Sequence, residues 1–289
     1  MKLIPVETPQ DFLVAQQFII PHEETCASLA SLVRRKSDKL VLISNSETTI
    51  LGILNLDSTI YHCIPEPALL DADFLKKELP FLLKKPVRCI SGESSGTDFL
   101  IDTAAPAQLP KIVYSYKMLR WLSAREAGIN VVSIRSSDYS TTSTGLSGGE
   151  EIIRCTENDM EILHPLQKDY MKDEVAVPGR SLTDAEVDIT LRQILKNQLC
   201  LALLCDGEPV AKANTNAIGI NCVQIGGVYT HPLYRRNGYA GALVQAICKR
   251  ARNAHRQPVL FVKYKNKPAF NLYQKLGFEE CGHYTIAYY

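Results

Sequence analysis

The sequence feature that most restricts the possible fold and chemistry of this chain is the change from a β pattern to a helical pattern near residue 235. An apolar run, Cys222 to Thr230, precedes a basic loop over residues 235–240 with the sequence RRNGYA, after which helical periodicity begins. Backbone N–H groups at the start of a helix are unpaired and, together with the helix dipole, attract an anion. Gly238 lets the main chain approach a bulky ligand closely. The sequence therefore predicts a phosphate-binding corner.

This corner differs from two common nucleotide-binding patterns, because the chain contains neither Gly-x-x-x-x-Gly-Lys nor Gly-x-Gly-x-x-Gly. Instead, Arg-x-x-Gly-x-Ala over 235–240 resembles the pyrophosphate motif of the GNAT superfamily of N-acetyltransferases, Gln/Arg-x-x-Gly-x-Gly/Ala. A second GNAT signature follows in order and spacing: a β run over 259–263, then Asn266, then a short helix with Tyr273 that ends before Phe278. The second half of the chain is therefore identified as a member of this superfamily.

The resemblance implies an α/β fold, the GNAT fold, in which a mixed, mostly antiparallel central sheet is flanked by helices. The pattern of the second half agrees with its element order, βααβββαβαβ. A capping box begins at Thr183 with Glu186 three residues later, which predicts a helix start. Asp206 and Gly207 between two apolar runs predict a hairpin. We expect a helix over residues 157–172, with Pro165 bending it.

The resemblance also implies that acetyl-CoA is the acyl donor. Its pantetheine arm would lie along the backbone of Val228, Tyr229 and Thr230, and the amide of Val228 or Tyr229 would donate to the thioester oxygen as charge develops there. The residues implied to hold the pyrophosphate are Arg235, Arg236, Asn237, Gly238, Tyr239, Ala240 and Gly241.

Two further residues take roles from the resemblance. Asn266 would bond the pantetheine arm, and it is also a good N-cap for the helix that follows. Tyr273 would donate a proton to the departing sulfur; a phenol titrates near 10 and a thiol near 8.5, so that transfer is nearly balanced. Tyr273 also lies on an apolar helical stripe with Leu272 and Leu276, so a purely structural role in the core is the alternative.

The sequence differs from better-known GNAT members at the position of the general base. Many of those members carry a glutamate on the fourth or fifth strand. The corresponding runs here, 222–229 and 259–264, contain no carboxylate. The candidates are Gln224 positioning a water, His231, a residue of the first half, or the C-terminal carboxylate of Tyr289.

The predicted order of strands and helices in the first half is similar to that in the second half. The residues over which we expect strands are 40–44, 48–54, 59–63, 87–91 and 111–119, and helical patterns begin after Thr8 and near Cys26, Asp73 and Ser95. After the strand over 59–63, however, the chain continues with prolines and acids that would repel a pyrophosphate. Residues 1–140 are therefore predicted to be a degenerate GNAT-like domain without cofactor, in tandem with an acetyl-CoA-binding domain over 150–289. The alternative is an unrelated α/β cap.

The small polar residues of Ser136–Gly149 predict the boundary between the two domains. We expect the first half to shape the acceptor cleft. Removing residues 1–140 should then damage acceptor use while leaving coenzyme affinity largely intact.

Charge and cysteine content restrict partners and compartment. The net charge of +1 gives no reason to expect nucleic acid or an anionic membrane as partner. Nine cysteines without a Cys-x-x-Cys pair suggest reduced thiols, and we find no signal-peptide pattern, so a cytoplasmic protein is expected. No His, Cys or carboxylate group has metal-ligand spacing, so no metal is predicted.

We therefore predict an acetyl-CoA-dependent N-acetyltransferase whose acceptor is a primary amine of a small molecule or a protein. One alternative is a tandem transferase resembling mycothiol synthase, with a sugar-linked amine as acceptor. A second alternative, favoured by the missing strand glutamate, is a module that senses acyl-CoA without catalysis.

Overall fold

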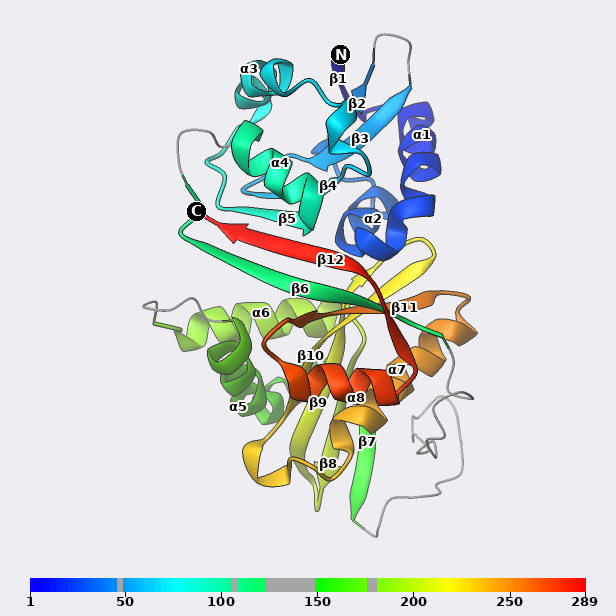
Figure 1. The fold of residues 1–289 in the computed structure, drawn as a ribbon. Coiled ribbons are helices and arrows are strands. Elements are labelled where there is room, and N and C mark those ends of the chain that lie inside the picture. Colours follow the sequence, from blue (N-terminus) through cyan, green and yellow to red (C-terminus); the bar gives the residue numbers. More distant parts are fainter. Residues whose placement is uncertain (46–48, 105–108, 123–148, 176–180) are drawn as a thin grey trace.

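The computed structural model describes residues 1–45, 49–104, 109–122, 149–175 and 181–289. The strands in these residues form one sheet in the order β1-β2-β3-β4-β5-β12-β6-β11-β10-β9-β8-β7. Within the described residues only β4–β5 and β10–β11 are parallel pairs. Figure 1 shows the sheet running from the first half to the second, with helices packed on it. The predicted α/β class with a mixed, mostly antiparallel sheet is confirmed.

The strands and helices predicted for the first half are all present, and the structure adds one N-terminal strand and two 3-10 turns that were not predicted. In chain order they are β1 (Lys2–Pro5), α1 (Pro9–Ile19), η1 (Ile20–Thr25), α2 (Ala27–Arg34), β2 (Leu40–Ser44), β3 (Ile50–Asn55), β4 (Thr59–Cys63), η2 (Pro67–Leu69), α3 (Ala72–Leu82), β5 (Cys89–Glu93), α4 (Ser94–Ala104) and β6 (Ile112–Trp121).

The second half has the predicted order of elements. They are β7 (Glu150–Arg154), η3 (Glu157–Asp159), α5 (Met160–Tyr170), η4 (Met171–Val175), α6 (Asp184–Asn197), β8 (Cys200–Cys205), β9 (Glu208–Ile218), β10 (Cys222–Thr230), η5 (Pro232–Tyr234), α7 (Tyr239–Asn253), β11 (Gln257–Lys263), α8 (Lys267–Lys275) and β12 (Phe278–Tyr288). The expected single helix over 157–172 is wrong in detail, because a 3-10 turn precedes α5 and a π turn follows it.

Local sequence signals account for several of these boundaries. The Thr183 hydroxyl accepts from the Glu186 N–H, and the Glu186 carboxylate accepts from the Thr183 N–H, so the predicted capping box starts α6. Asp206 and Gly207 have φ of 50° and 87°, the left-handed conformation that a tight two-residue hairpin needs. Both predictions are confirmed.

Two strands in the middle of the sheet belong to opposite halves of the sequence. β6, from the first half, lies between β11 and β12, and its Tyr116 faces both Lys263 and Tyr284. β12, from the end of the chain, lies between β6 and β5. Figure 1 shows β6 and β12 side by side across the middle of the molecule. Each half therefore completes its part of the sheet with a strand supplied by the other half.

This exchange bears on the predicted division of the chain. The predicted linker, 136–149, lies outside the described residues except at Gly149, so domains over 1–140 and 150–289 stay a prediction. A fragment without residues 1–140 lacks the strand between β11 and β12. The position of β6 therefore argues against the expectation that such a fragment keeps its coenzyme affinity.

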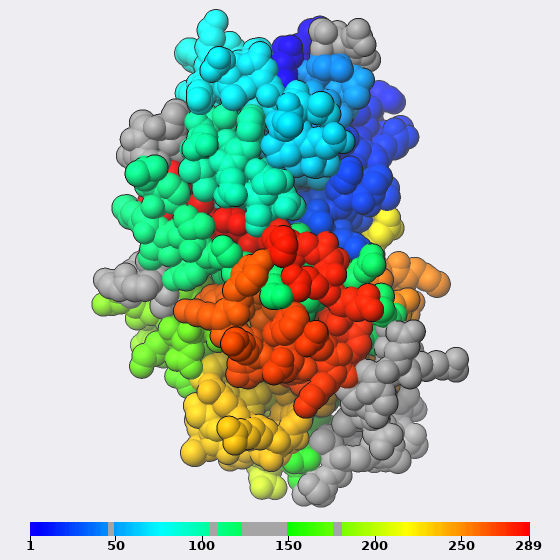
Figure 2. All heavy atoms as spheres, viewed as in Figure 1, coloured from blue at the N-terminus to red at the C-terminus, as the bar shows by residue number. Residues whose placement is uncertain are grey.

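Polar contacts fix the first half against the β9–β10 turn. The buried Glu23 carboxylate accepts hydrogen bonds from the N–H groups of Asn221 and Cys222, each at 2.9 Å. Arg34 donates from Nε to the carbonyl of Ile218 at 2.9 Å. Figure 2 shows the first half, blue to teal, resting directly on the orange and red residues of the second half. The junction between the halves is thus packed and hydrogen-bonded.

In the part of the chain that the structure describes, no helix combines the length and the apolar character that crossing a membrane requires.

Candidate active site

The candidate site begins where β10 and β11 separate. These parallel strands pair from Cys222 with Gln257 to Ile225 with Leu260, and no further pair is formed. β10 nevertheless continues to Thr230 and β11 to Lys263. Beyond Leu260 the two strands no longer pair with each other. Their facing backbone N–H and C=O groups are therefore available to a ligand between the strands.

A β-bulge in β10 lies directly after the separation. Gly226 faces Asn214 and Tyr229 faces Lys212, so Gly227 and Val228 together oppose a single residue of β9. Gly227 has φ of 58°, and a Cβ there would lie 1.8 Å from Oδ1 of Asn214. The bulge therefore requires glycine at 227 and re-aims the peptide groups next to it.

The predicted phosphate corner lies at the same end of β10. Gly238, with φ of 83°, caps α7 without a side-chain hydrogen bond to the first turn. Arg235, Arg236, Asn237 and Gly238 are exposed, and the N–H groups at the start of α7 are available to an anion. The residues that the sequence predicts for the pyrophosphate thus lie together in one exposed turn and helix start.

Two residues of this corner have side chains turned elsewhere. The Tyr239 hydroxyl contacts the Glu150 carboxylate, and this hydrogen bond raises its pKa above the ordinary value. Tyr239 can therefore serve a phosphate through its backbone only. Arg235 donates from Nε to the carbonyl of Thr230 at 3.1 Å, and its guanidinium lies 5.6 Å from the ring centre of Tyr229. The guanidinium of Arg236 forms no hydrogen bond or ion pair with the described residues, so it is available to a ligand.

Asn266 and Tyr273 come from the segment after β11. The side chain of Asn266 accepts from the Ala269 N–H at 3.2 Å, so its predicted role as the N-cap of α8 is confirmed. Tyr273 is 7% exposed and packs edge-on against Phe278 with ring centres 5.8 Å apart. Burial, followed by the nearby Tyr170 and Glu174, raises the pKa of Tyr273 above its ordinary value. The phenol thus keeps its proton more firmly than a free tyrosine.

The groups predicted as possible bases include the side chains of Gln224 and His231 and the C-terminal carboxylate of Tyr289. Oε1 of Gln224 accepts from the Ser28 hydroxyl at 3.1 Å, which ties it to the first half. Tyr289 packs against the core of the first half and donates its N–H to the Arg88 carbonyl at 3.0 Å. His231 lies edge-on to Tyr234, and its buried Nδ1 has no hydrogen-bond partner among the described residues.

The sequence analysis did not identify two carboxylates that contact the separated strands, Asp173 and Glu174. Oδ2 of Asp173 accepts from the Tyr229 hydroxyl at 3.0 Å, and Oε2 of Glu174 lies 3.6 Å from Nζ of Lys263. Nζ of Lys263 also donates to the Glu174 carbonyl. The turn η4 therefore contacts the far ends of both separated strands. No pattern marks these acids in the sequence, because they follow a helix and belong to no motif.

The first half has a counterpart of this separation, and its own side chain fills it. β4 and β5 pair from Thr59 with Cys89 to Tyr61 with Ser91. The next residue, His62, is buried, and its Nε2 is 2.8 Å from Oγ1 of Thr97. A Cβ at Gly92 would lie 2.1 Å from that nitrogen. Burial lowers the pKa of His62 to about 3, so the imidazole is neutral.

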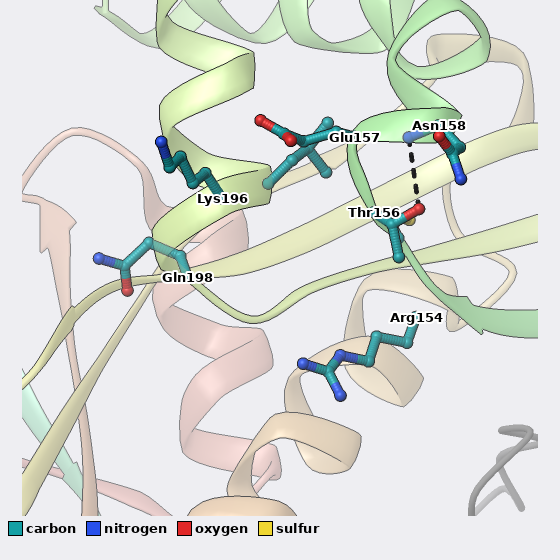
Figure 3. A pocket seen from close by; sticks show the side chains of 8 residues that line it. Arg154, Thr156, Glu157, Asn158, Lys196 and Gln198 are labelled. Carbon is teal, nitrogen blue, oxygen red and sulfur yellow. Dashed lines mark hydrogen bonds between the residues drawn. The ribbon is translucent and has the colours of Figure 1, made fainter.

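An open pocket of about 400 Å³ lies elsewhere, between the end of β7 and the end of α6 (Figure 3). Its labelled side chains are Arg154, Thr156, Glu157, Asn158, Lys196 and Gln198. It contains none of the predicted site residues and carries charges of both signs. In the described residues no group of three or more His, Cys, Asp or Glu side chains is placed to hold a metal ion.

Comparison with known proteins agrees with this geometry. Residues 163–278 match the model of the acetyltransferase (GNAT) family. No curated protein matches the chain. Among solved structures, a Drosophila protein has a TM-score of 0.61 at 14% identity, and the match covers 99% of this chain and 98% of that one.

Two solved acetyltransferases match over nearly the full length. A GCN5-related N-acetyltransferase from Sphaerobacter thermophilus has a TM-score of 0.57 at 12% identity, covering 99% of this chain and 94% of its own. A GNAT-family acetyltransferase from Colwellia psychrerythraea has a TM-score of 0.56 at 9% identity, covering 100% and 99%. The family match shows that the second half of this chain belongs to the GNAT acetyltransferase family, and the full-length likeness shows that the whole chain has a tandem GNAT-like fold.

Proposed function

We propose that this protein transfers an acetyl group from acetyl-CoA to a primary amine. The observation that carries the proposal is the coincidence of three features at one end of β10: the separation of β10 from β11, the bulge at Gly227, and the uncapped N–H groups at the start of α7. A strand edge suits a pantetheine arm, and a helix start suits a pyrophosphate. The strand edge of β10 and the start of α7 follow each other along the chain, as the pantetheine arm and the pyrophosphate follow each other along one extended donor.

In this proposal the second half binds the donor. The backbone of Val228, Tyr229 and Thr230 pairs with the pantetheine arm, and the turn from Arg235 to Gly241 holds the pyrophosphate. Arg236 adds an exposed guanidinium that forms no ion pair or hydrogen bond with the described residues. Hydrogen bonds between a guanidinium and a phosphate are stronger than hydrogen bonds between neutral groups. Asn266 adds a side-chain contact without leaving its position as N-cap.

Acyl transfer requires an uncharged amine, a donor for the developing oxyanion and a proton for the thiolate. The amine nitrogen forms a bond to the acetyl carbon while the carbon–sulfur bond breaks. We assign the proton on sulfur to Tyr273. Its raised pKa makes this phenol a weaker acid than a free tyrosine, so the transfer to the thiolate is less balanced than the sequence predicts. We assign removal of the amine proton to Glu174, the carboxylate that lies beside Lys263 at the end of β11.

The first half contributes to the acceptor side through β6. Its Tyr116 is half-buried, and the loss of hydration, followed by the neighbouring Tyr288, Tyr170, Tyr114 and Glu174, raises its pKa above the ordinary value. Nζ of Lys263 lies 5.1 Å from the ring centre of Tyr114. The carboxylate assigned as base thus shares its surroundings with tyrosines of a strand from the first half. This supports an acceptor cleft built by both halves.

Two measurements test the proposal. Titration of CoA into the full chain by calorimetry should give saturable binding, and no heat would end the proposal. A panel of amines, including a sugar-linked amine, should then contain an acceptor, and Tyr273→Phe should reduce its turnover while CoA binding persists. Binding of CoA without acetylation of any amine would favour the acyl-CoA sensor instead.

A further inference from the structure

Lys212 of β9 is a buried cation outside the roles assigned so far. Its side chain is fully buried, and it is one of the largest fully buried side chains among the described residues. Among the described carboxylates none forms an ion pair with it. Burial lowers its pKa from the ordinary value, as expected for an ammonium removed from water. A lysine in such surroundings is costly, so its contacts need an explanation.

The ammonium of Lys212 contacts the bulge of β10 from behind. Nζ donates to the carbonyl oxygen of Gly227 at 3.1 Å and to Oδ1 of Asn214 at 3.2 Å. It also lies 4.9 Å from the ring centre of Tyr170. Since a Cβ at Gly227 would collide with Asn214, glycine allows the bulged peptide to pack directly on this polar pair.

The contact acts on one particular peptide group. The carbonyl of Gly227 and the N–H of Val228 belong to the same planar trans peptide, so they point in opposite directions. Because the carbonyl points to the ammonium of Lys212, the N–H of Val228 points away from that ammonium. β10 has already separated from β11 at this peptide, so β11 supplies no ladder partner for this N–H. A donor on the carbonyl also polarises the peptide and strengthens its N–H as a donor.

We infer that Lys212 is a positioning residue: it holds and polarises the Gly227–Val228 peptide so that the Val228 N–H is the donor to the thioester oxygen. This inference rests on the proposed function. It also chooses Val228 over Tyr229, between which the sequence leaves the donor open. Nζ donates in either charge state, so the contact to Gly227 persists when the lysine is neutral.

A labelling experiment can observe this peptide alone, because Gly227–Val228 is the only Gly–Val dipeptide in the sequence. The full chain labelled with glycine carrying carbonyl ¹³C and with ¹⁵N-valine should give a single cross-peak in a spectrum that correlates an amide with the preceding carbonyl. We expect its amide proton to shift much more with acetyl-CoA than with CoA, which lacks the thioester carbonyl. An equal response to both ligands would overturn the inference.

Substitution of the lysine tests the second part. Lys212→Met keeps the apolar stem and removes the donor. We expect the Gly227 carbonyl carbon to move upfield and kcat to fall about 10- to 100-fold, less than the 10²–10³ typical of removing an oxyanion donor itself. The affinity for CoA should stay within about twofold. Lys212→Arg, which restores a donor, should recover part of the loss in kcat.

A spectroscopic readout separates positioning from a structural role. The infrared band of ¹³C-labelled thioester carbonyl in bound acetyl-CoA should lie at lower frequency than in free acetyl-CoA, and Lys212→Met should remove much of that shift. An unchanged band and unchanged kcat in Lys212→Met would overturn the inference while the proposed function stands. If Lys212→Met does not fold, the Lys212→Arg band and the wild-type amide shift decide. Absence of any CoA binding to wild-type protein would instead remove the proposed function itself.

Discussion

Trp121 of β6 donates its indole N–H to the carbonyl oxygen of Leu276 at 2.8 Å. Trp121 ends a strand encoded in the first half of the chain, and Leu276 follows α8 in the second. The indole is 4% exposed and lies in the same core as residues of α7 and β11. The core of the second half is therefore incomplete without a strand from the first half.

This relationship predicts that the second half does not fold alone. Residues 141–289 expressed without the first half lack β6, so Leu260 and Phe278 lose the partners that β6 supplies in the sheet. We expect this fragment to aggregate or to show no cooperative thermal transition. Co-expression with residues 1–140 as a separate chain should yield a 1:1 complex that binds CoA. A cooperative melt of the isolated fragment would contradict the role given to β6.

Much of the local structure could be predicted because its signals are local. A cap needs only residues a few positions apart, as with Thr183 and Glu186, and a hairpin needs only Asp206 and Gly207 between two strands. The partners of β6 could not be predicted in this way. Its alternation of residues identifies a strand, but its neighbours β11 and β12 lie more than 130 residues later in the sequence, and no pattern specifies them.

The candidate site divides along the same line. Its coenzyme side rests on a contiguous motif, so residues 235–241 could be placed from the sequence. Lys212 and Asn214 alternate with alanines in β9, a pattern typical of a strand with one face in water. Both residues are buried, because helices of the second half cover both faces of this sheet. The position of Glu174 could not be predicted from the sequence either, because it depends on the contact between η4 and Lys263.

The exposed guanidinium of Arg236 predicts an electrostatic contribution to coenzyme binding. We expect Arg236→Gln to raise the Kd for CoA about tenfold, which corresponds to about 1.4 kcal/mol. The effect should shrink at high salt, because exposed charges are screened. Lys249→Gln is the matched control, since Lys249 is an exposed cation farther along α7. Calorimetry that gives both variants the wild-type Kd would argue against the phosphate corner.

The position of Glu174 predicts a defect in chemistry rather than in binding. Glu174→Gln should lower kcat by about 10²-fold or more, the usual contribution of a general base, with little change in the affinity for CoA. Part of the rate should return at high pH, where more of the acceptor amine is neutral. Glu161→Gln, on the exposed face of α5, is the control for loss of one negative charge. Wild-type kcat in Glu174→Gln would exclude this base.

The buried His62 predicts that the protein loses stability in weak acid. Its pKa is lowered from 6.5 to about 3 by burial, so between these pH values the unfolded chain binds a proton that the folded chain does not. The free energy of unfolding should therefore fall as the pH drops below 6.5, by about 1.4 kcal/mol per pH unit, or about 2 kcal/mol at pH 5. His62→Gln keeps a side-chain donor near Thr97 and cannot titrate. Denaturant unfolding at pH 7.5 and pH 5 should show a smaller loss for this variant than for wild type, and parallel losses would rule out His62 as the source.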